Sequence, residues 1–408
     1  MREKIIWLVA YCVEKGANFI FLPLVVAAFG AKSYSIYAQT LASAAMISVV
    51  VILGQGTLLI KNNPEGDCEK IRIYINKVVV IFAIEAIFLL GLFLVYGRDI
   101  SVFVYGGDVS FLFLFFIVAF AFVDVAFEVV CVSALRARSE FKRGSFFVIL
   151  KTAGKLVPLI GCLWVKVELV EYMMLSLALQ GGLVIIQYAN SCRGKRRAGQ
   201  SVRVMDGAFD VVVNALLVTG LLSVSRYVLV NKTDIFTVGY YSAITTITGV
   251  VAILYSGTGY FLYTKIVKQW AGGDFVGLRQ LYLKALAWFV LIAATLSFLV
   301  CIAGDLVFSL VYGEGVKVGA WSFLFLALFQ VLFGVYQFSY YVILMGAHTR
   351  YNFFLIGPAI ALLVVVQGLV IPHHGLVGAA FVQMMVMGVV AGISVLVVMR
   401  RLRARITL

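Results

Sequence analysis

The chain is poor in charged residues. Only 13% of its 408 residues are Asp, Glu, Lys or Arg, whereas 63% are hydrophobic, and the mean hydropathy is +1.05. Soluble domains contain about 25% charged and about 45–50% apolar residues, so this chain lacks the charge to cover a surface that faces water. The composition excludes a soluble enzyme, a disordered chain and a disulfide-stapled protein, and it indicates a protein whose solvent is largely lipid.

Cysteine and histidine are scarce as well. The chain has six cysteines and three histidines. No two cysteines form a Cys-x-x-Cys pair, so we interpret them as small packing residues rather than as disulfides or metal ligands. His373 and His374 are adjacent but have no carboxylate nearby, and two such ligands alone are weak support for a metal site. The sequence therefore predicts neither a metal site nor a cofactor.

Catalytic motifs are missing too. We find no Gly-x-Ser-x-Gly, no His-Glu-x-x-His, no Walker A and no acidic metal motif, which are typical of hydrolases, zinc proteases and nucleotide-driven proteins. We expect a protein that is not an enzyme and has no ATPase of its own. Any transport is then driven by an ion gradient or is facilitated.

Long apolar runs, in contrast, are abundant. A membrane helix needs about 20 apolar residues. The chain contains twelve such stretches, at residues 5–29, 37–60, 74–96, 109–135, 144–165, 169–190, 209–231, 238–263, 282–303, 320–344, 351–371 and 375–399. Residues 111–122 are apolar on every face, unlike the alternating pattern of a membrane strand. The sequence predicts an all-α polytopic membrane protein with twelve transmembrane helices.

Positive charge is concentrated on one side of these spans. The formal net charge is +14, which in a soluble protein would suggest a nucleic acid partner. If the amino terminus is cytoplasmic, most lysines and arginines fall in cytoplasmic segments, and few fall opposite, namely Lys32, Arg98, Lys166, Lys232 and Lys317. Because positive loops favour the cytoplasm, we expect both termini there, and no nucleic acid partner.

The two halves of the chain resemble each other. The segment 103–116 (FVYGGDVSFLFLFF) recurs at 310–328, and shorter matches link 37–57 with 241–259 and 135–147 with 344–354. Each half holds six expected spans, so the halves are parallel repeats of a kind common in transporters.

This repeat predicts the domain organisation. We expect an N-terminal six-helix lobe at residues 1–192, a basic cytoplasmic linker at 193–208 and a C-terminal six-helix lobe at 209–408. The two parallel lobes are expected to surround a central cavity, because the substrate path of such transporters lies between the repeats.

Charged residues fall inside several spans. Each costs about 2.5–3.5 kcal/mol near the bilayer centre on insertion scales, so we expect them to face a wet cavity or one another. They are Glu14, Lys15, Glu85, Asp124, Glu128, Lys151, Lys155, Asp210 and Arg226. Of these, Asp210 lies near the interface and needs little explanation.

Two pairs of these charges have helical spacing. Asp124 and Glu128 are four residues apart on the fourth span, and Lys151 and Lys155 are four apart on the fifth, so each pair lies on one face. Counted at about 1.5 Å per residue, Glu128 lies at the depth of Lys151, and Asp124 at the depth of Lys155. They are either structural ion bridges or lysines that present charge to an anionic headgroup while the carboxylates modulate them.

The remaining charges have separate interpretations. Glu14, Lys15 and Asn18 make the middle of the first span polar, which favours a cavity wall. Glu85 is alone near the middle of the third span, where a structural role and a functional role are equally open. Arg226 lies in the outer third of the seventh span, where snorkelling to the interface is the alternative to a binding role.

Short motifs mark both halves of the chain. They are 14–16 (EKG), 21–24 (FLPL), 34–37 (YSIY), 54–56 (GQG), 136–142 (RARSEFK), 238–242 (VGYYS), 312–313 (YG) and 374–380 (HGLVGAA). Together they resemble the landmarks of polysaccharide-exporting flippases of the multidrug/oligosaccharidyl-lipid/polysaccharide exporter superfamily. The resemblance covers nearly the whole chain.

The resemblance implies a function. It suggests that the protein moves undecaprenyl-pyrophosphate-linked oligosaccharide repeat units from the inner to the outer leaflet of a bacterial plasma (inner) membrane by alternating access, as in O-antigen and lipopolysaccharide biosynthesis. It makes Lys15, Lys151, Lys155 and Arg226 candidates for substrate binding in a cationic cavity. Asn18, in the same polar cluster of the first span, is a further substrate-binding candidate. The family often has an Asp before the arginine of the seventh span, whereas this chain has a serine there.

Ion coupling is a further hypothesis, motivated by the depth of the acidic residues. Glu14, Glu85, Asp124 and Glu128 are candidates to couple H⁺ or Na⁺ entry to the transport cycle. Candidate protein partners are a glycan polymerase and its chain-length machinery.

Two alternative functions remain open. A multidrug/cation antiporter of the same superfamily would favour an acidic cavity. A membrane-embedded glycan polymerase or acyltransferase usually has a long outer loop or a catalytic histidine inside a span.

Overall fold

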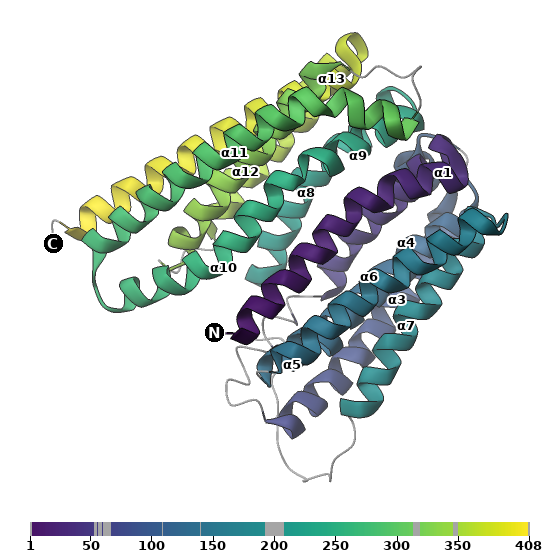
Figure 1. The fold of residues 1–408 in the computed structure, drawn as a ribbon, viewed down its shortest axis with the longest axis horizontal. Helices are drawn as coiled ribbons and strands as arrows, with labels where there is room; N and C mark the ends of the chain where they lie inside the picture. Colours follow the sequence, from purple (N-terminus) through teal and green to yellow (C-terminus); the bar gives the residue numbers. More distant parts are fainter. Residues whose placement is uncertain are drawn as a thin grey trace. The chain divides into compact units, whose positions relative to one another are not determined.

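A computed structural model describes residues 2–52, 55, 59, 67–107, 109–138, 140–191, 208–312, 319–345 and 350–406. These residues are helical apart from short connections, and no strand occurs among them (Figure 1). The elements are α1 (Arg2–Ile52), α3 (Cys68–Tyr105), α4 (Phe111–Phe127), the π-helix η1 (Glu128–Ser133), α5 (Ala134–Ala137), α6 (Phe141–Trp164), α7 (Leu169–Ser191), α8 (Ala208–Lys232), α9 (Ile235–Thr248), α10 (Val250–Ala271), α11 (Phe275–Tyr312), α12 (Ala320–Met345) and α13 (Arg350–Ile406).

The helices account for the expected membrane spans. Within the described ranges, nine helices are long and apolar enough to cross a membrane. Two of them are broken at a glycine with positive φ, Gly30 (φ 81°) in α1 and Gly375 (φ 53°) in α13, a conformation that glycine adopts without a steric penalty. The helices α1 and α13 therefore each contain two of the twelve expected spans, and α9 together with α10 contains one more. The predicted all-α polytopic fold is confirmed.

The chain divides into two compact units, Met1–Ser223 and Val224–Leu408, with the division inside α8. The predicted linker at 193–208 lies outside the described residues except for Ala208. The predicted lobe boundaries therefore stay a prediction.

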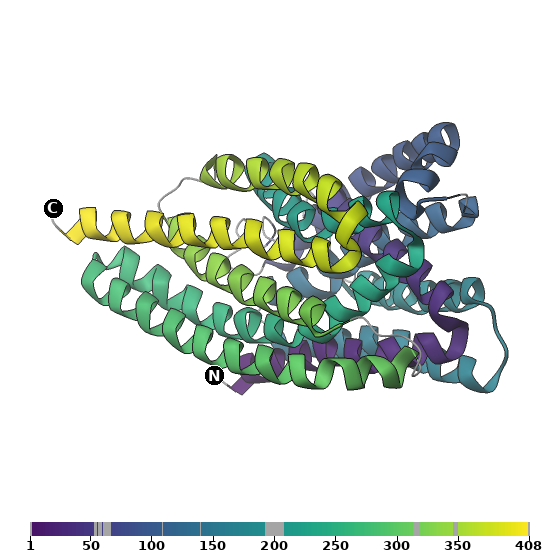
Figure 2. The same cartoon turned by 90° about the horizontal axis from the view of Figure 1, so that it is seen from above.

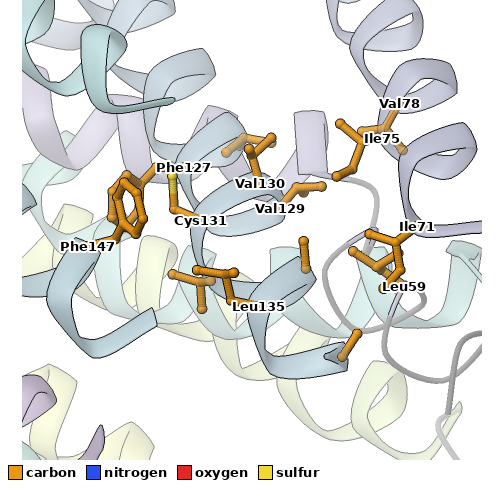
Figure 3. Close-up of a cluster of buried hydrophobic side chains, with 14 of the residues drawn as sticks. Leu59, Ile71, Ile75, Val78, Phe127, Val129, Val130, Cys131, Leu135 and Phe147 are labelled. Carbon is orange, nitrogen blue, oxygen red and sulfur yellow. The ribbon is translucent and has the colours of Figure 1, made fainter. Parts of the chain in front are cut away.

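In the first unit, α1 packs mainly against α6 and α4, and α4 also contacts α3 and α7 (Figure 1). Its apolar core gathers around the second half of the fourth span (Figure 3). There Cys131 lies beside the rings of Phe127 and Phe147, while Val129 and Val130 lie on the side toward α3. In lipid, close van der Waals packing rather than water exclusion holds such helices together.

In the second unit, α12 is the central helix and packs against α13, α11 and α10. Figure 2 shows α13 turning back at its break, so that its two arms run in opposite directions. Phe289 and Phe338 meet edge to face with ring centroids 4.9 Å apart, and the hydroxyls of Tyr282 and Ser339 are hydrogen-bonded at 2.8 Å. These contacts fix α11 against α12.

The two units repeat one close contact at positions that the sequence duplication aligns. A Cβ atom added to Gly97 of α3 would lie 2.9 Å from the ring of Phe111, the first residue of α4. In the second unit, a Cβ atom at Gly304 of α11 would lie 2.7 Å from the ring of Phe323 in α12. Each glycine is required because the aromatic ring occupies the space of its missing side chain, so the duplication extends to packing.

Candidate functional site

The first unit contains a polar cavity of about 360 Å³ between α1, α4 and α6. Four charged side chains share its wall. The lining residues are Glu14, Ala17, Asn18, Phe21, Leu41, Asp124, Lys151, Thr152, Lys155 and Leu156. The cavity therefore brings together two members of the predicted polar cluster of the first span, one of the two predicted carboxylates of the fourth span and both predicted lysines of the fifth.

Helical spacing explains how the wall is built. Glu14, Asn18 and Phe21 follow the i, i+4, i+7 pattern of one face of α1, and Lys151 and Lys155 are one turn apart on α6. These positions lie about half-way along their helices, so the cavity lies deep within the span. At this depth each charge needs a partner or water, because a lone charge in lipid is costly.

Lys151 is the centre of the charge cluster. Its Nζ lies 2.8 Å from Oδ1 of Asp124 and 4.7 Å from the centroid of the Phe127 ring. The lysine side chain is 14% exposed and that of the aspartate 33%. Glu14 and Glu128 also attract this ammonium group, so one cation is shared among three carboxylates from α1, α4 and η1.

This pairing matches the sequence-based one in part. Equal depth predicted Glu128 opposite Lys151 and Asp124 opposite Lys155. An ion bridge between the fourth and fifth spans is present and Glu128 does attract Lys151, but the direct ion pair joins Asp124 to Lys151. Part of the reason is η1, whose i→i+5 bonding inserts an extra residue into the cytoplasmic half of the fourth span. A count at the α-helical rise therefore places Asp124 about 1.5 Å too far from the cytoplasmic end. The flexible four-carbon stem of Lys151 spans the rest of the difference in depth.

The π-helix also positions Glu128. The Oγ of Ser133, five residues on, donates a hydrogen bond of 3.2 Å to Oε1 of Glu128, and the charge of Arg136 acts on the same carboxylate. Glu128 is not among the residues that line the cavity but interacts with Glu14 and Lys151, which do. It is a second carboxylate placed behind the Asp124–Lys151 pair.

An aromatic cluster that the residue pattern does not predict adjoins the cavity. The ring of Phe21, which lines the cavity, lies 5.7 Å from that of Tyr37 and 6.3 Å from that of Tyr172 between centroids. Tyr172 also contacts Phe29 and donates a 3.3 Å hydrogen bond from its hydroxyl to the carbonyl of Lys155. The helical spacing from Glu14 to Phe21 was the available signal for Phe21, but nothing in the sequence links Tyr172 to this site.

Two further predicted site residues of the first unit are not part of the described cavity wall. The backbone of Lys15 belongs to α1, but its side chain is not among those that the structure describes. Glu85 lies on α3 and does not line the cavity; its neighbours Ile84 and Phe88 are 63% and 69% exposed. Its Oε2 atom is buried without a hydrogen-bond partner in the described part of the chain.

Arg226 lies in the second unit, in a different polar cluster. Its charge acts on Tyr241, whose hydroxyl donates to Oε1 of Gln383. Beside it, Nε2 of Gln367 donates to Oγ of Ser225 and to the carbonyl of Ala379, both at 2.9 Å. Ser225, which stands where the family resemblance implied an aspartate, thus accepts a hydrogen bond from an amide instead of forming an ion pair with the arginine beside it.

No group of three or more histidine, cysteine, aspartate or glutamate residues could hold a metal ion within the described ranges. The chemistry available in the cavity is therefore that of ammonium groups, carboxylates and an amide. Such a wall can bind an anion at its lysines, and it can exchange a proton or a cation at its carboxylates.

Comparison with known proteins gives the fold a context. No protein-family model matches the chain, and no curated protein matches it. Among solved structures, the chain is similar to an inward-facing multidrug resistance MATE family transporter of the MOP superfamily, with a TM-score of 0.74 and 14% identity over 97% of this chain and 95% of that one. An outward-facing structure described in the same terms gives a TM-score of 0.66 with 14% identity, covering 100% of this chain and 95% of that one.

A third similar structure is a MOP superfamily transporter from Pyrococcus furiosus, with a TM-score of 0.64 and 13% identity over 99% of this chain and 94% of that one. That protein is described as having a binding pocket of reverse polarity, which suggests a different function. The chain therefore has the fold of MOP superfamily transporters over nearly its whole length. Fold alone does not choose the substrate.

Proposed function

We propose that this protein is a flippase that moves undecaprenyl-pyrophosphate-linked oligosaccharide repeat units from the inner to the outer leaflet of a bacterial plasma membrane, with both termini in the cytoplasm. The observation that carries the proposal is the pair of lysines, Lys151 and Lys155, on the wall of a cavity deep within the first unit. A pyrophosphate cannot enter hydrocarbon unaided, and cations fixed on a cavity wall supply the compensating charge.

The two lysines have different tasks in this proposal. Asp124 binds Lys151 directly, and two further carboxylates attract it, so Lys151 is the site at which substrate and carboxylates compete for one cation. Lys155 lies one turn farther along α6, and Asn18 offers an amide across the cavity. We assign the first contact of the anionic headgroup to Lys155, and we assign Lys15 and Arg226 a supporting electrostatic role.

Ion coupling follows from the same competition. When the headgroup binds Lys151, Asp124 loses its cation, and a proton or Na⁺ is the natural replacement. Glu14 and Glu128 are near enough to Lys151 to take part. Release of the headgroup restores the ion pair and expels the ion, which links transport to the gradient.

A second candidate is a multidrug/cation antiporter. The similarity to multidrug resistance MATE family transporters favours it, and the cavity carboxylates Glu14 and Asp124 offer sites for an organic cation. The two lysines on the same wall oppose it, because they would repel such a substrate. The similar structure from Pyrococcus furiosus is described as having a binding pocket of reverse polarity that suggests a different function. This supports the use of cavity charge to choose between the two candidate substrates.

A strain that lacks the protein separates the two candidates. The flippase function predicts that complete repeat units accumulate on the lipid carrier while surface polysaccharide is lost, with unchanged drug tolerance. The antiporter function predicts normal polysaccharide and altered drug tolerance. The second outcome would refute the flippase proposal.

Complementation of that strain tests the residues. Lys155→Gln is expected to restore little surface polysaccharide, whereas Lys166→Gln, an exposed lysine just beyond the same helix, restores it fully. Both variants must reach the membrane in equal amounts. Full complementation by Lys155→Gln would remove this lysine from the transport path.

A further inference from the structure

The second unit contains a cleft that the transport site does not use. It has a volume of about 290 Å³ and lies between α10, α11 and α12. Apart from one lysine its lining is apolar: Leu254, Leu262, Lys265, Leu281, Ala285, Trp288, Phe289, Ile292 and Phe338. Trp288 is 58% exposed and Ile292 is 49% exposed, so the cleft opens sideways from the unit toward the hydrocarbon of the bilayer.

The two sides of the cleft have matched lengths. On α10 the lining runs from Leu254 to Lys265, and on α11 it runs from Leu281 to Ile292. At about 1.5 Å per residue each side is about 16 Å long, which is about half of the 30 Å hydrocarbon core. The cleft therefore spans the depth of one leaflet, and its volume, at the lower end for ligand pockets, suits a single hydrocarbon chain rather than a whole lipid.

Charge is placed at one end of the cleft. Lys265 lies at the end nearest the turn that joins α10 to α11, and the exposed cations Lys268, Arg279 and Lys284 lie on the same hairpin. The local acidic residue, Asp274, accepts a hydrogen bond from the backbone of Gly277 at the start of α11. The hairpin end thus has an excess of positive charge where a lipid phosphate would lie, and the apolar end lies where a chain would run.

We infer that this cleft binds an anionic membrane phospholipid, with one acyl chain between α10, α11 and α12 and the phosphate at Lys265. Charge complementarity at the hairpin end and the single-leaflet depth favour this occupant over a longer polyprenyl chain. The site is separate from the cavity of the first unit and does not depend on the proposed transport function. Its occupant would brace α11 against α10, two helices that contact each other directly.

Native mass spectrometry of the full-length protein in detergent tests this inference, with phosphatidylglycerol and phosphatidylcholine of equal chain length as probes. The wild type is expected to retain phosphatidylglycerol more tightly. Lys265→Gln should weaken phosphatidylglycerol binding by about tenfold, the effect of one charge-assisted contact. It should weaken phosphatidylcholine binding less, because the choline cation offsets the charge of the phosphate. Lys268→Gln, an exposed lysine of the same helix outside the lining, is the matched control and should have little effect.

A second pair of variants tests the apolar part. Ala285→Phe fills the cleft and should reduce binding of both lipids, whereas Ala287→Phe adds the same bulk to an exposed position of α11 and should reduce neither. Unchanged lipid binding in Ala285→Phe would show that the cleft is not the binding site.

Two other outcomes would also overturn the inference. Equal losses in Lys265→Gln and Lys268→Gln would mean that general surface charge, and not the cleft, attracts the lipid. Displacement of phosphatidylglycerol from the wild type by a polyprenyl phosphate would mean that the occupant is a polyprenyl lipid. Because Lys265 is exposed, its replacement should not disturb folding. Lys265→Gln therefore tests whether its charge binds the lipid phosphate even if Ala285→Phe fails to fold.

Discussion

A single lysine organises the polar interior of the first unit. Lys151 is held by Asp124 at 2.8 Å and is attracted by two further carboxylates. An ion pair at an exposed surface contributes about 0–1 kcal/mol, whereas the loss of one partner from a buried pair costs about 3–5 kcal/mol. With side chains 14% and 33% exposed, this pair lies between the two limits.

The first prediction follows from that intermediate burial. Lys151→Gln should destabilise the protein by about 1–3 kcal/mol, because Asp124 loses its ion-pair partner and the two other carboxylates lose a nearby positive charge. Asp124→Asn should cost less, since two carboxylates remain beside the lysine. The double variant should be more stable than the sum of the two single effects, which thermal unfolding in detergent measures as a coupling energy.

The exposed pair Glu140–Arg143, also at 2.8 Å, provides the control. The same cycle there should give a coupling below about 1 kcal/mol. Equal coupling in the two cycles would mean that the cavity is as wet as the surface and that Lys151 has no special place in it.

Among the helices, the fourth span shows what the sequence predicts and what it does not. The position of the span and the shared face of Asp124 and Glu128 follow from apolar length and helical spacing. The π-turn at its cytoplasmic end has no comparable signal, because apolar residues such as Val129 and Val130 fit an α-helix equally well. The predicted ion pairing therefore differs from the observed one partly because of this local backbone conformation, which the residue pattern leaves open, and partly because a long lysine side chain can reach a carboxylate at another depth.

The second prediction concerns this π-helix. Ser133→Ala removes the hydrogen bond to Glu128 and should cost about 1 kcal/mol of stability. Ser145→Ala on α6 removes a hydrogen bond to the carbonyl of Phe141 and is the matched control. If Glu128 takes part in ion coupling, Ser133→Ala should also shift the pH dependence of transport in proteoliposomes, whereas Ser145→Ala should not.

The third prediction concerns helix packing. Gly97→Ala places a Cβ atom 2.9 Å from the ring of Phe111, and Gly304→Ala places one 2.7 Å from the ring of Phe323. Overpacking of this kind costs about 1–3 kcal/mol, so both variants should lower the melting temperature in detergent. Gly91→Ala on α3 meets nothing within 4 Å and should be neutral or slightly stabilising. A similar loss in all three variants would point to glycine flexibility, not to the aromatic contact.

At the scale of the whole chain, duplication has kept the scaffold and changed the polar interior. In the register that aligns Ser110 with Ser322, Asp124 and Glu128 correspond to Tyr336 and Tyr340. These two tyrosines stack on each other with centroids 5.9 Å apart. Fold class and the repeat could be predicted because both depend on apolar length and internal similarity. The sequence also shows that charge is unevenly distributed. That these charges line one cavity follows only from the convergence of three helices of the first unit.

The fourth prediction tests that asymmetry. Glu14, Glu85, Asp124 and Glu128 were equal candidates for ion coupling in the sequence, yet the structure places Glu85 on α3 away from the cavity and the other three around Lys151. Neutralising Glu14, Asp124 or Glu128 one at a time should abolish the dependence of transport on a proton or Na⁺ gradient in at least one variant, because a carboxylate that exchanges an ion for Lys151 cannot do so as an amide.

Glu85→Gln should leave gradient dependence unchanged, because Glu85 does not line the cavity. Transport in proteoliposomes with imposed pH or Na⁺ gradients measures the gradient dependence of each variant, at equal protein incorporation. Unaltered dependence in all three cavity variants would show that the carboxylates only balance the lysines, so that the gradient acts elsewhere or not at all. A loss confined to Glu85→Gln would instead move the coupling site to α3, where one oxygen of the Glu85 carboxylate is buried without a hydrogen-bond partner in the described part of the chain.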